Sequence, residues 1–376
     1  MRGRTYAVVA GILVALILTR CGNDLIGENP KQEQDSQVET EQVSEQLTES
    51  EKEPEPVVTT LRITAAGDCA LGALQYHAYK SSFHEFYDTY GEKYFFENFQ
   101  EIFAEDDMTL VNLECVFTEA DDKVEKEFNI KGKPSYSGIL SSSSIEAVSL
   151  GNNHTRDYGQ NGLQDTKNSL DEAGVLYAIN DIISYYTTKD GMLVAVLSAS
   201  VTSGGNANDQ YLLNGVTEAK NQGADLVVVS CHWGIEKEFY PNDYQRNLGH
   251  ALIDKGADLI IGTHPHVLQG VEEYKGKLII YSLANFSFGA NRNPEDKDTA
   301  VFQQTFTFID GVLQSDITAK MIPTRLSGHD YYNDYQPVIA QDEQAKVIIQ
   351  RLNDYSAPYG GVYFDEQGNL LIKAAE

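Results

Sequence analysis

The chain has 376 residues and carries 56 acidic against 28 basic side chains, a formal net charge of −28. Nucleic acid is excluded as a partner, because holding a polyanion needs a basic surface that such a chain lacks. With 41% hydrophobic residues and 30 glycines the chain can bury a core, so full disorder is also excluded. The charge is uneven: residues 1–21 carry +3, residues 22–60 carry −9, and residues 61–376 remain acidic at −22.

The first 21 residues have the pattern of an export signal. Arg2 and Arg4 precede an apolar run over 6–18, which is shorter than the roughly 20 residues of a membrane-spanning helix. The run leads into Leu-Thr-Arg-Cys at 18–21, which resembles a bacterial lipoprotein cleavage box except that Arg20 stands where a small residue is usual. We therefore expect a lipid-anchored protein on the extracytoplasmic face of a bacterial membrane. A secreted form without the anchor, or an uncleaved or differently cleaved segment, is the alternative.

Residues 22–60 are expected to form a disordered acidic linker. Glu, Gln, Ser, Thr and Pro dominate this segment, and few large apolar side chains are present to offset the entropy of ordering. A spacer between membrane and domain needs only this composition, while an acidic tail that binds a partner is the alternative. The remaining residues, 61–376, are predicted to form one domain.

Short β-rich segments alternate with amphipathic segments along this domain, which is typical of an α/β fold. The predicted strands are 61–66, 108–113, 147–150, 175–179, 192–197, 225–230, 258–261 and 277–281. The predicted helices are 162–174, 209–223 and 244–256, each ending at a glycine. Further on, 300–309 and 312–323 flank an Asp-Gly turn and predict an antiparallel hairpin, so the sheet is expected to be mixed.

Polar side chains follow five of the predicted strands at their carboxyl ends. Ligands bind at this edge of open α/β sheets, so these side chains are expected to converge on one site. Carboxylate, amide and imidazole groups together suit a divalent ion such as Mn, Fe, Zn or Mg, and two ions bridged by a carboxylate would use all of them. The side chains concerned are Asp68, Asn112, Glu114, Asn152, Asn153, His154, His232, His264 and His266.

Six ordered motifs between about residues 61 and 289 resemble the bacterial capsule-synthesis CapA family. That family is associated with poly-γ-glutamate and belongs to the calcineurin-like metallophosphoesterase superfamily. The motifs are Ala66-Gly67-Asp68, Asn112-Leu113-Glu114, Gly151-Asn152-Asn153-His154 with Asp157 and Gly159, His232-Trp233-Gly234 with Glu236, Gly256-Ala257-Asp258 through His264-Pro265-His266, and Tyr281-Ser282-Leu283-Ala284-Asn285-Phe286. The resemblance implies an α/β/β/α four-layer sandwich, with two mixed β-sheets flanked by helices.

The superfamily's pattern also implies a role for each motif residue. The implied metal ligands are Asp68 and His266 for a first ion, Asn153, His232 and His264 for a second, and Glu114 as the bridge. His154 takes the position of the general acid, and Asp157 could orient it through a hydrogen bond. The first motif differs from the superfamily, which usually has Asp-x-His where this chain has Asp68-Cys69-Ala70. The first ion therefore has one ligand fewer, and either one or two bound ions are expected.

Three further residues are candidates for contact with substrate. Trp233 and Glu236 follow His232 and are expected to line the substrate cleft, with Trp233 capping the hydrophobic layer as the alternative. Asn285, in the last motif, is also a substrate-binding candidate.

Three cysteines, Cys69, Cys115 and Cys231, each stand beside a proposed ligand. Because side chains alternate between the two faces of an extended chain, the cysteines are expected to point away from the metal and fill the core. A thiolate ligand is the alternative.

The resulting hypothesis is a metal-dependent hydrolase or transferase that acts in the synthesis, release or anchoring of a cell-surface polymer. The resemblance implies poly-γ-glutamate as that polymer, and membrane synthase components are further candidate partners. A secreted phosphomonoesterase or phosphodiesterase acting on a small phosphoester stays open, as does a non-catalytic lipoprotein scaffold that binds polymer. The charge of −22 disfavours a polyanionic substrate unless the cleft is locally positive or holds metal.

Overall fold

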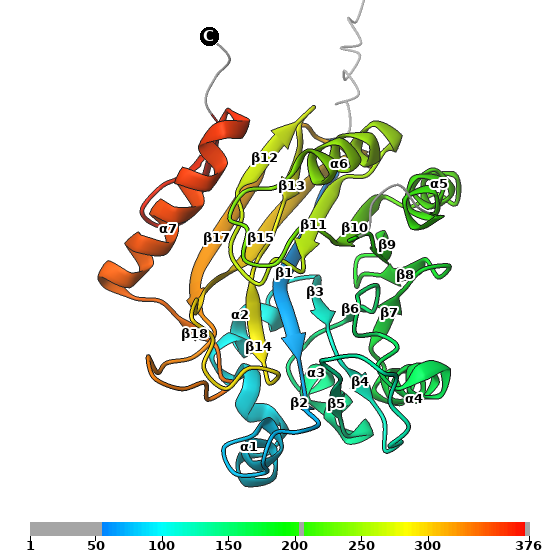
Figure 1. Ribbon diagram of the computed structural model, residues 1–376. Helices are drawn as coiled ribbons and strands as arrows, with labels where there is room; N and C mark the ends of the chain where they lie inside the picture. Colours follow the sequence, from blue (N-terminus) through cyan, green and yellow to red (C-terminus); the bar gives the residue numbers. More distant parts are fainter. Residues whose placement is uncertain (1–54, 203–206, 373–376) are drawn as a thin grey trace, which may run out of the picture. The chain divides into compact units, whose positions relative to one another are not determined.

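Two mixed β-sheets form the centre of the domain in the computed structural model, which describes residues 55–202 and 207–372 (Figure 1). The predicted export signal and most of the predicted linker lie outside the described residues. Within the described part, none of the helices combines the length and the apolar character needed to cross a bilayer.

The larger sheet has nine strands. They are β1 (Val58–Ala70), β3 (Met108–Leu113), β6 (Ala147–Ser149), β7 (Leu176–Ala178), β14 (Asn285–Phe288), β15 (Asp298–Ile309), β16 (Val312–Leu313), β17 (Thr318–Arg325) and β18 (Val338–Ile339). The order is β18-β17-β15-β1-β3-β6-β7, with β14 paired to β1 and β16 paired to β15. The pairs from β1 through β3 and β6 to β7 are parallel, whereas β15 is antiparallel to both β1 and β17.

The smaller of the two central sheets has six strands. They are β8 (Ser184–Thr187), β9 (Leu193–Ser200), β10 (Leu226–His232), β11 (Leu259–Thr263), β12 (Val271–Tyr274) and β13 (Lys277–Ile280). In the order β12-β13-β11-β10-β9-β8, the inner four strands are parallel and the two edge strands are antiparallel to their neighbours. Both sheets are therefore mixed.

Helices and two short sheets complete the domain. The short sheets contain β2 (Ala73–Leu74), β5 (Ile130–Gly132) and β4 (Val116–Phe117), and β19 (Val362–Phe364) with β20 (Leu370–Ile372). The α-helices are α1 (Phe83–Tyr90), α2 (Gln100–Ala104), α3 (Ser137–Ser141), α4 (Gly159–Ala173), α5 (Ala207–Asn221), α6 (Asp243–Lys255) and α7 (Asp342–Ser356). Short 3₁₀ helices are η1 (Glu92–Phe99), η2 (Pro134–Tyr136) and η3 (Ala357–Tyr359).

Three buried hydrophobic clusters define the layers. Successive side chains of a strand point to opposite faces, and in β10 Leu226 and Val228 enter the cluster between the two sheets, whereas Val227 and Val229 enter the cluster under α5 and α6. The third cluster lies on the outer face of the larger sheet, where α1 to α4 cover it. The order of layers is helix, sheet, sheet, helix, which confirms the predicted four-layer α/β sandwich.

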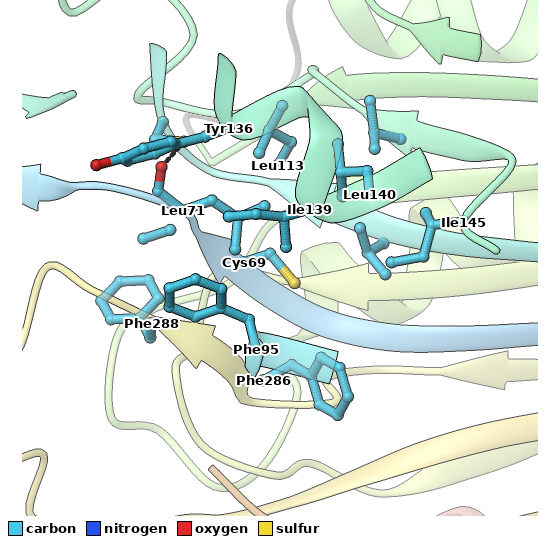
Figure 2. Close-up of a cluster of buried hydrophobic side chains, with 14 of the residues drawn as sticks. Cys69, Leu71, Phe95, Leu113, Tyr136, Ile139, Leu140, Ile145, Phe286 and Phe288 are labelled. Carbon is cyan, nitrogen blue, oxygen red and sulfur yellow. Dashed lines mark hydrogen bonds between the residues drawn. The ribbon is translucent and has the colours of Figure 1, made fainter. Parts of the chain in front are cut away.

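The three cysteines in the described part of the chain are unpaired and buried. Figure 2 shows Cys69 among apolar side chains that include Leu113 and Phe286. Cys115 belongs to the same cluster, and Cys231 lies in the cluster under α5 and α6. Burial raises the pKa of all three thiols, which disfavours a thiolate and agrees with core filling.

Most predicted boundaries differ from the structure by a few residues, and two differences change an assignment. Residues 58–60, which the sequence places in the linker, are the first residues of β1 and pair with β15. The predicted strand 312–323 is divided into β16 and β17. The turn before it is as predicted, since Asp310 and Gly311 have φ values of 50° and 77°, which suit a tight hairpin.

Candidate metal centre

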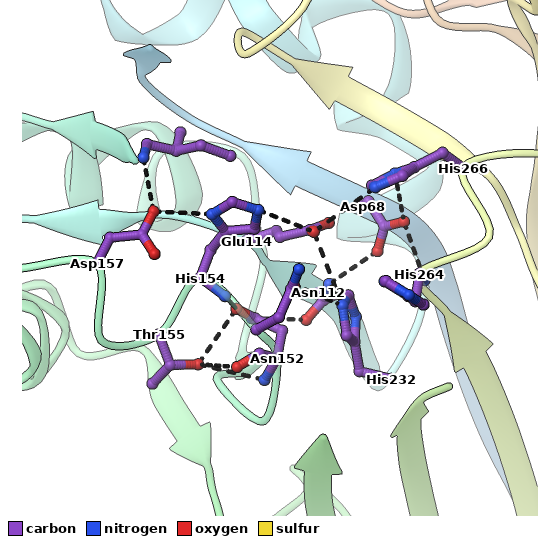
Figure 3. A network of polar contacts seen from close by, with 12 residues as sticks. Asp68, Asn112, Glu114, Asn152, His154, Thr155, Asp157, His232, His264 and His266 are labelled. Carbon is purple, nitrogen blue, oxygen red and sulfur yellow. Dashed lines mark hydrogen bonds and ion pairs between the residues drawn. The ribbon is translucent and has the colours of Figure 1, made fainter. Parts of the chain in front are cut away.

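The ends of strands from both sheets bring the predicted ligands together (Figure 3). Asp68 in β1 and Glu114 directly after β3 belong to the larger sheet. His232 ends β10, and His264 and His266 follow β11 in the smaller sheet. The site therefore lies where the carboxyl ends of the parallel strands meet, as the sequence predicts.

The candidate ligand atoms fall into three sets, and within each set all atoms lie within 4.8 Å of one another. The sets are Glu114 with His232 and His264, Asp68 with Glu114 and His266, and Glu236 with His264 and His266. The first two sets share Glu114, so this carboxylate stands between two positions that could each hold a metal ion. That is the arrangement which the superfamily resemblance implies for a bridging ligand.

The Glu114 carboxylate is fully buried, and neither of its oxygens has a hydrogen-bond partner. Its Oε1 is 3.7 Å from His232 Nε2, 3.8 Å from His266 Nε2 and 3.9 Å from His154 Nε2. Burial, together with the charge of Asp68, raises the pKa of Glu114. A buried carboxylate without a hydrogen bond is costly, and the three imidazole nitrogens near Oε1 lie beyond hydrogen-bond distance. A divalent cation would satisfy both oxygens, so the residues present fit a metal ion.

Hydrogen bonds fix Asp68 on the other side of the cluster. Asn112 Nδ2 donates to Oδ1 at 2.7 Å, and the His264 backbone N–H donates to Oδ2 at 3.2 Å. Burial would lower the pKa of His266, but Glu114 and Asp68 outweigh it and raise the pKa to about 10. The two carboxylates thus favour a positive charge at this place, which a bound divalent ion would supply instead of the His266 proton, since a ligating imidazole is neutral.

His232 and His264 have the opposite tendency. Burial is the main cause that lowers the pKa of both imidazoles, so they remain neutral, as metal ligands must be. Thr263 Oγ1 lies 3.0 Å from His232 Nδ1 and holds the ring so that Nε2 faces Glu114. The same Nε2 is 2.9 Å from the side-chain oxygen of Asn153, which places this predicted ligand at the second position.

His154 and Asp157 lie next to the cluster as a hydrogen-bonded pair. His154 Nδ1 is 2.7 Å from Asp157 Oδ2, which also accepts a hydrogen bond from the Ile130 backbone N–H at 2.7 Å. The other ring nitrogen, Nε2, faces Glu114. Asp157 therefore directs His154 toward the cluster.

Sequence reasoning missed Lys126, which joins this pair from the loop between β4 and β5. Its Nζ is 2.5 Å from Asp157 Oδ1 and 3.3 Å from His154 Nδ1, and it donates to the Asn153 carbonyl at 3.0 Å. A lysine in an acidic loop without any motif gives no signal in the sequence that would distinguish it from a surface residue.

Of the three residues predicted to contact substrate, one is buried and two line a cleft. Trp233 is fully buried in the cluster under α5 and α6, and its Nε1 donates to the Tyr281 carbonyl at 2.9 Å. A side chain with no exposed surface does not line a cleft, so its assignment to substrate contact is corrected to packing. Asn285 and Glu236 do line the cleft, and Asn285 Oδ1 also holds His266 Nδ1 at 2.9 Å.

A cleft of about 980 Å³ opens beside the cluster. His154, Glu236 and His266 face it, together with Phe128 and Phe288. The lysine and arginine side chains of the cleft already have partners. Arg351 forms ion pairs with Asp296 and Asp298, Arg325 with Asp330, and Lys237 with Glu295. Lys297 donates hydrogen bonds to the Asn293 side chain and the Tyr332 carbonyl. The side chains therefore do not make the cleft locally positive.

Strained backbone conformations accompany the site. His264, His266 and Ala284 have φ values of 97°, 56° and 61°, a region that L-residues other than glycine seldom adopt. Such strain persists where the surrounding structure imposes it, and it concentrates at functional sites.

Comparison with known proteins identifies the class of this chain. Residues 62–290 match the family described as "Bacterial capsule synthesis protein PGA_cap", a segment that contains every candidate ligand. The chain therefore belongs to this bacterial capsule synthesis family, which confirms the resemblance in its motifs.

Individual relatives carry related names. The chain is 36% identical over 186 residues to "PGA biosynthesis protein CapA" of Bacillus subtilis (strain 168), covering 44% of this chain and 48% of that protein. It is 31% identical over 270 residues to "Capsule biosynthesis protein CapA" of Bacillus anthracis, covering 65% of this chain and 63% of that protein. The matches thus span about half to just under two-thirds of these relatives. A crystal structure of a "novel phosphatase" from Mycoplasma pneumoniae aligns with a TM-score of 0.45 at 13% identity, covering 71% of this chain and 95% of that chain.

Proposed function

We propose that the chain is a metal-dependent hydrolase or transferase, lipid-anchored outside the bacterial membrane, that acts on a cell-surface polymer such as poly-γ-glutamate. Membership of the capsule synthesis family supports the polymer. The observation that carries the proposal is the buried carboxylate of Glu114, which makes no hydrogen bond and is shared between two sets of candidate ligands. Such a carboxylate is explained by a cation between the sets.

The chain's own residues have distinct parts in the proposed reaction. A bound divalent ion would activate a water molecule and polarise the carbonyl or phosphoryl oxygen of the substrate. His154 presents Nε2 toward the cluster and would protonate the leaving group, while Asp157 holds the ring through Nδ1. Asn285 and Asp68 hold His266 in place through its Nδ1.

The charge of the domain restricts how an anionic polymer could bind. Residues 61–376 carry −22, and the basic side chains of the cleft are engaged with acidic or polar groups. An anionic substrate would therefore depend on the metal centre for attraction, and its binding should be lost together with the metal.

Elemental analysis tests the proposal most directly. Protein purified without added metal, and again after reconstitution, is compared with Asp68→Ala and His266→Ala. Wild type should retain a transition metal in stoichiometric amount and the variants should retain less. His329→Ala is the control, because that imidazole stacks on Tyr332 and belongs to none of the three sets of candidate ligands. Wild type that binds no metal after reconstitution would refute the proposal.

A phosphoesterase acting on small phosphoesters is the second candidate, favoured by two metal positions that share a carboxylate. Hydrolysis of simple phosphate esters that stops in Asn153→Ala and His232→Ala would support it. A scaffold that only binds polymer is the third, favoured by the missing histidine of the first motif. Polymer binding that a chelator leaves unchanged would support the scaffold.

A further inference from the structure

The third set of candidate ligands contains a residue to which neither the sequence nor the family resemblance gives a metal. Glu236 lies with its carboxylate within 4.8 Å of the ligand nitrogens of His264 and His266. We propose that Glu236 is an additional metal ligand, which closes the cluster on the cleft side and replaces the ligand missing from the first motif. This inference rests on the proposed function, because it concerns the same metal centre.

The three sets are linked in a ring. Glu114 belongs to the first and second sets, His264 to the first and third, and His266 to the second and third. A carboxylate at Glu236 is therefore close to ligands of both metal positions. Glu114 approaches from the buried side, whereas Glu236 is exposed and lines the cleft. Glu236 is thus the member of its set that a molecule in the cleft would meet most openly.

The loop that carries Glu236 is anchored to the segment that carries the two histidines. The backbone N–H of Lys237 donates to the Pro265 carbonyl at 2.8 Å, between His264 and His266 in the sequence. One residue further, the Glu238 carbonyl accepts from Gln269 Nε2 at 2.8 Å. The backbone therefore holds Glu236 beside the cluster, where its carboxylate already lies within 4.8 Å of the ligand nitrogens of both histidines.

The ligand count gives the chemical reason. Asp68, Glu114 and His266 supply three protein ligands at the first position. In the first motif, Cys69 and Ala70 pack in the apolar cluster on the outer face of the larger sheet and cannot contribute. Glu236 shares a set with His266, though not with Asp68 or Glu114, and would add an oxygen ligand on the His266 side of this position. A carboxylate oxygen suits the harder divalent ions such as Mn²⁺.

Metal titration of the full-length protein tests the inference without any activity assay. Metal-free wild type, Glu236→Gln and Glu238→Gln are titrated with Mn²⁺ by calorimetry, and bound metal is counted by elemental analysis. Glu236→Gln should weaken binding by about tenfold or more, or lower the number of bound ions, while its thermal melting without metal stays that of wild type. Glu238→Gln, an exposed carboxylate two residues away, should bind as wild type does. Glu236→Asp should recover part of the affinity.

Two results would overturn the inference and are distinguishable. If Glu236→Gln binds Mn²⁺ with the stoichiometry and affinity of wild type and of Glu238→Gln, Glu236 is no ligand. If wild type itself binds no metal, the proposed function fails, and the inference fails with it.

Discussion

Adding a single methyl group at Gly67 should disturb both the fold and the metal centre. A Cβ at this position would lie 1.9 Å from the Ala284 carbonyl oxygen and 2.9 Å from its carbon. Carbon–oxygen contacts need about 3.3 Å, so β1 and the Ala284 backbone would have to separate by about 1.4 Å. The separation would break the hydrogen bond of 2.9 Å from Asp68 N–H to Ala284. Overpacking and the lost hydrogen bond together predict a loss of about 2–4 kcal/mol in the free energy of unfolding for Gly67→Ala.

Urea unfolding followed by circular dichroism measures this loss, and elemental analysis measures metal content in the same samples. Because Asp68 follows Gly67 directly, Gly67→Ala should also retain less metal. Gly328→Ala is the matched control, since its Cβ would meet only a Val338 methyl group at 3.7 Å, and its stability should stay within about 0.5 kcal/mol of wild type. A loss below about 1 kcal/mol in Gly67→Ala, with wild-type metal content, would refute the reasoning.

Three further predictions concern other parts of the domain. Lys126→Met should lower kcat by about tenfold at unchanged KM, because Asp157 loses its ion pair and orients His154 less well. This loss is part of the 10²–10⁴ that a general acid contributes. Lys126→Arg should restore most of the lost kcat, and a larger effect on KM than on kcat would contradict the role. Cys69→Ala should cost about 1 kcal/mol in urea unfolding and leave the metal content unchanged, whereas metal loss would show the thiol to be a ligand. Burial raises the pKa of Asp106 to about 7 in the folded state, against about 3.9 when unfolded. Stability is therefore lost as the pH rises toward and through 7, and Asp106→Asn should gain more stability over wild type at pH 8 than at pH 5; an equal gain in thermal melts at both values would contradict this.

The strands and helix ends that depend on neighbouring residues in the sequence were predicted correctly. The predicted strand 108–113 is β3 with the same bounds, and all of its residues are buried, as is usual for a strand inside a parallel region of a sheet. The predicted helix ends at Gly174 and Gly256 are left-handed caps, a conformation that glycine adopts without strain. Local sequence patterns do not show which distant segments pair with one another. The short sheet of β2, β5 and β4, which carries the Lys126 loop, was therefore not predicted.

The alternation of side chains explains why Trp233 was misassigned. His232 points into the candidate metal centre, so both of its neighbours must point to the opposite face. Cys231 and Trp233 indeed belong to the same cluster under α5 and α6. The rule that predicted the cysteine correctly applies equally to the tryptophan, although the loop begins there. Glu236 lies beyond the strand, where alternation no longer holds, and its position depends on the hydrogen bond to Pro265.

The candidate metal centre lies where the two sheets meet, and this position has a consequence for how the site forms. Asp68 and His264, one from each sheet, are 196 residues apart in the chain, so the ligand set is complete only after both sheets have formed and docked. A bound ion would act as a cross-link between them, and its removal should increase hydrogen exchange first in the layer between the sheets. If the chain crosses the membrane unfolded, it cannot carry the ion with it. The metal would then be acquired outside the cell membrane, and the supply of free ion there would decide which metal the protein holds.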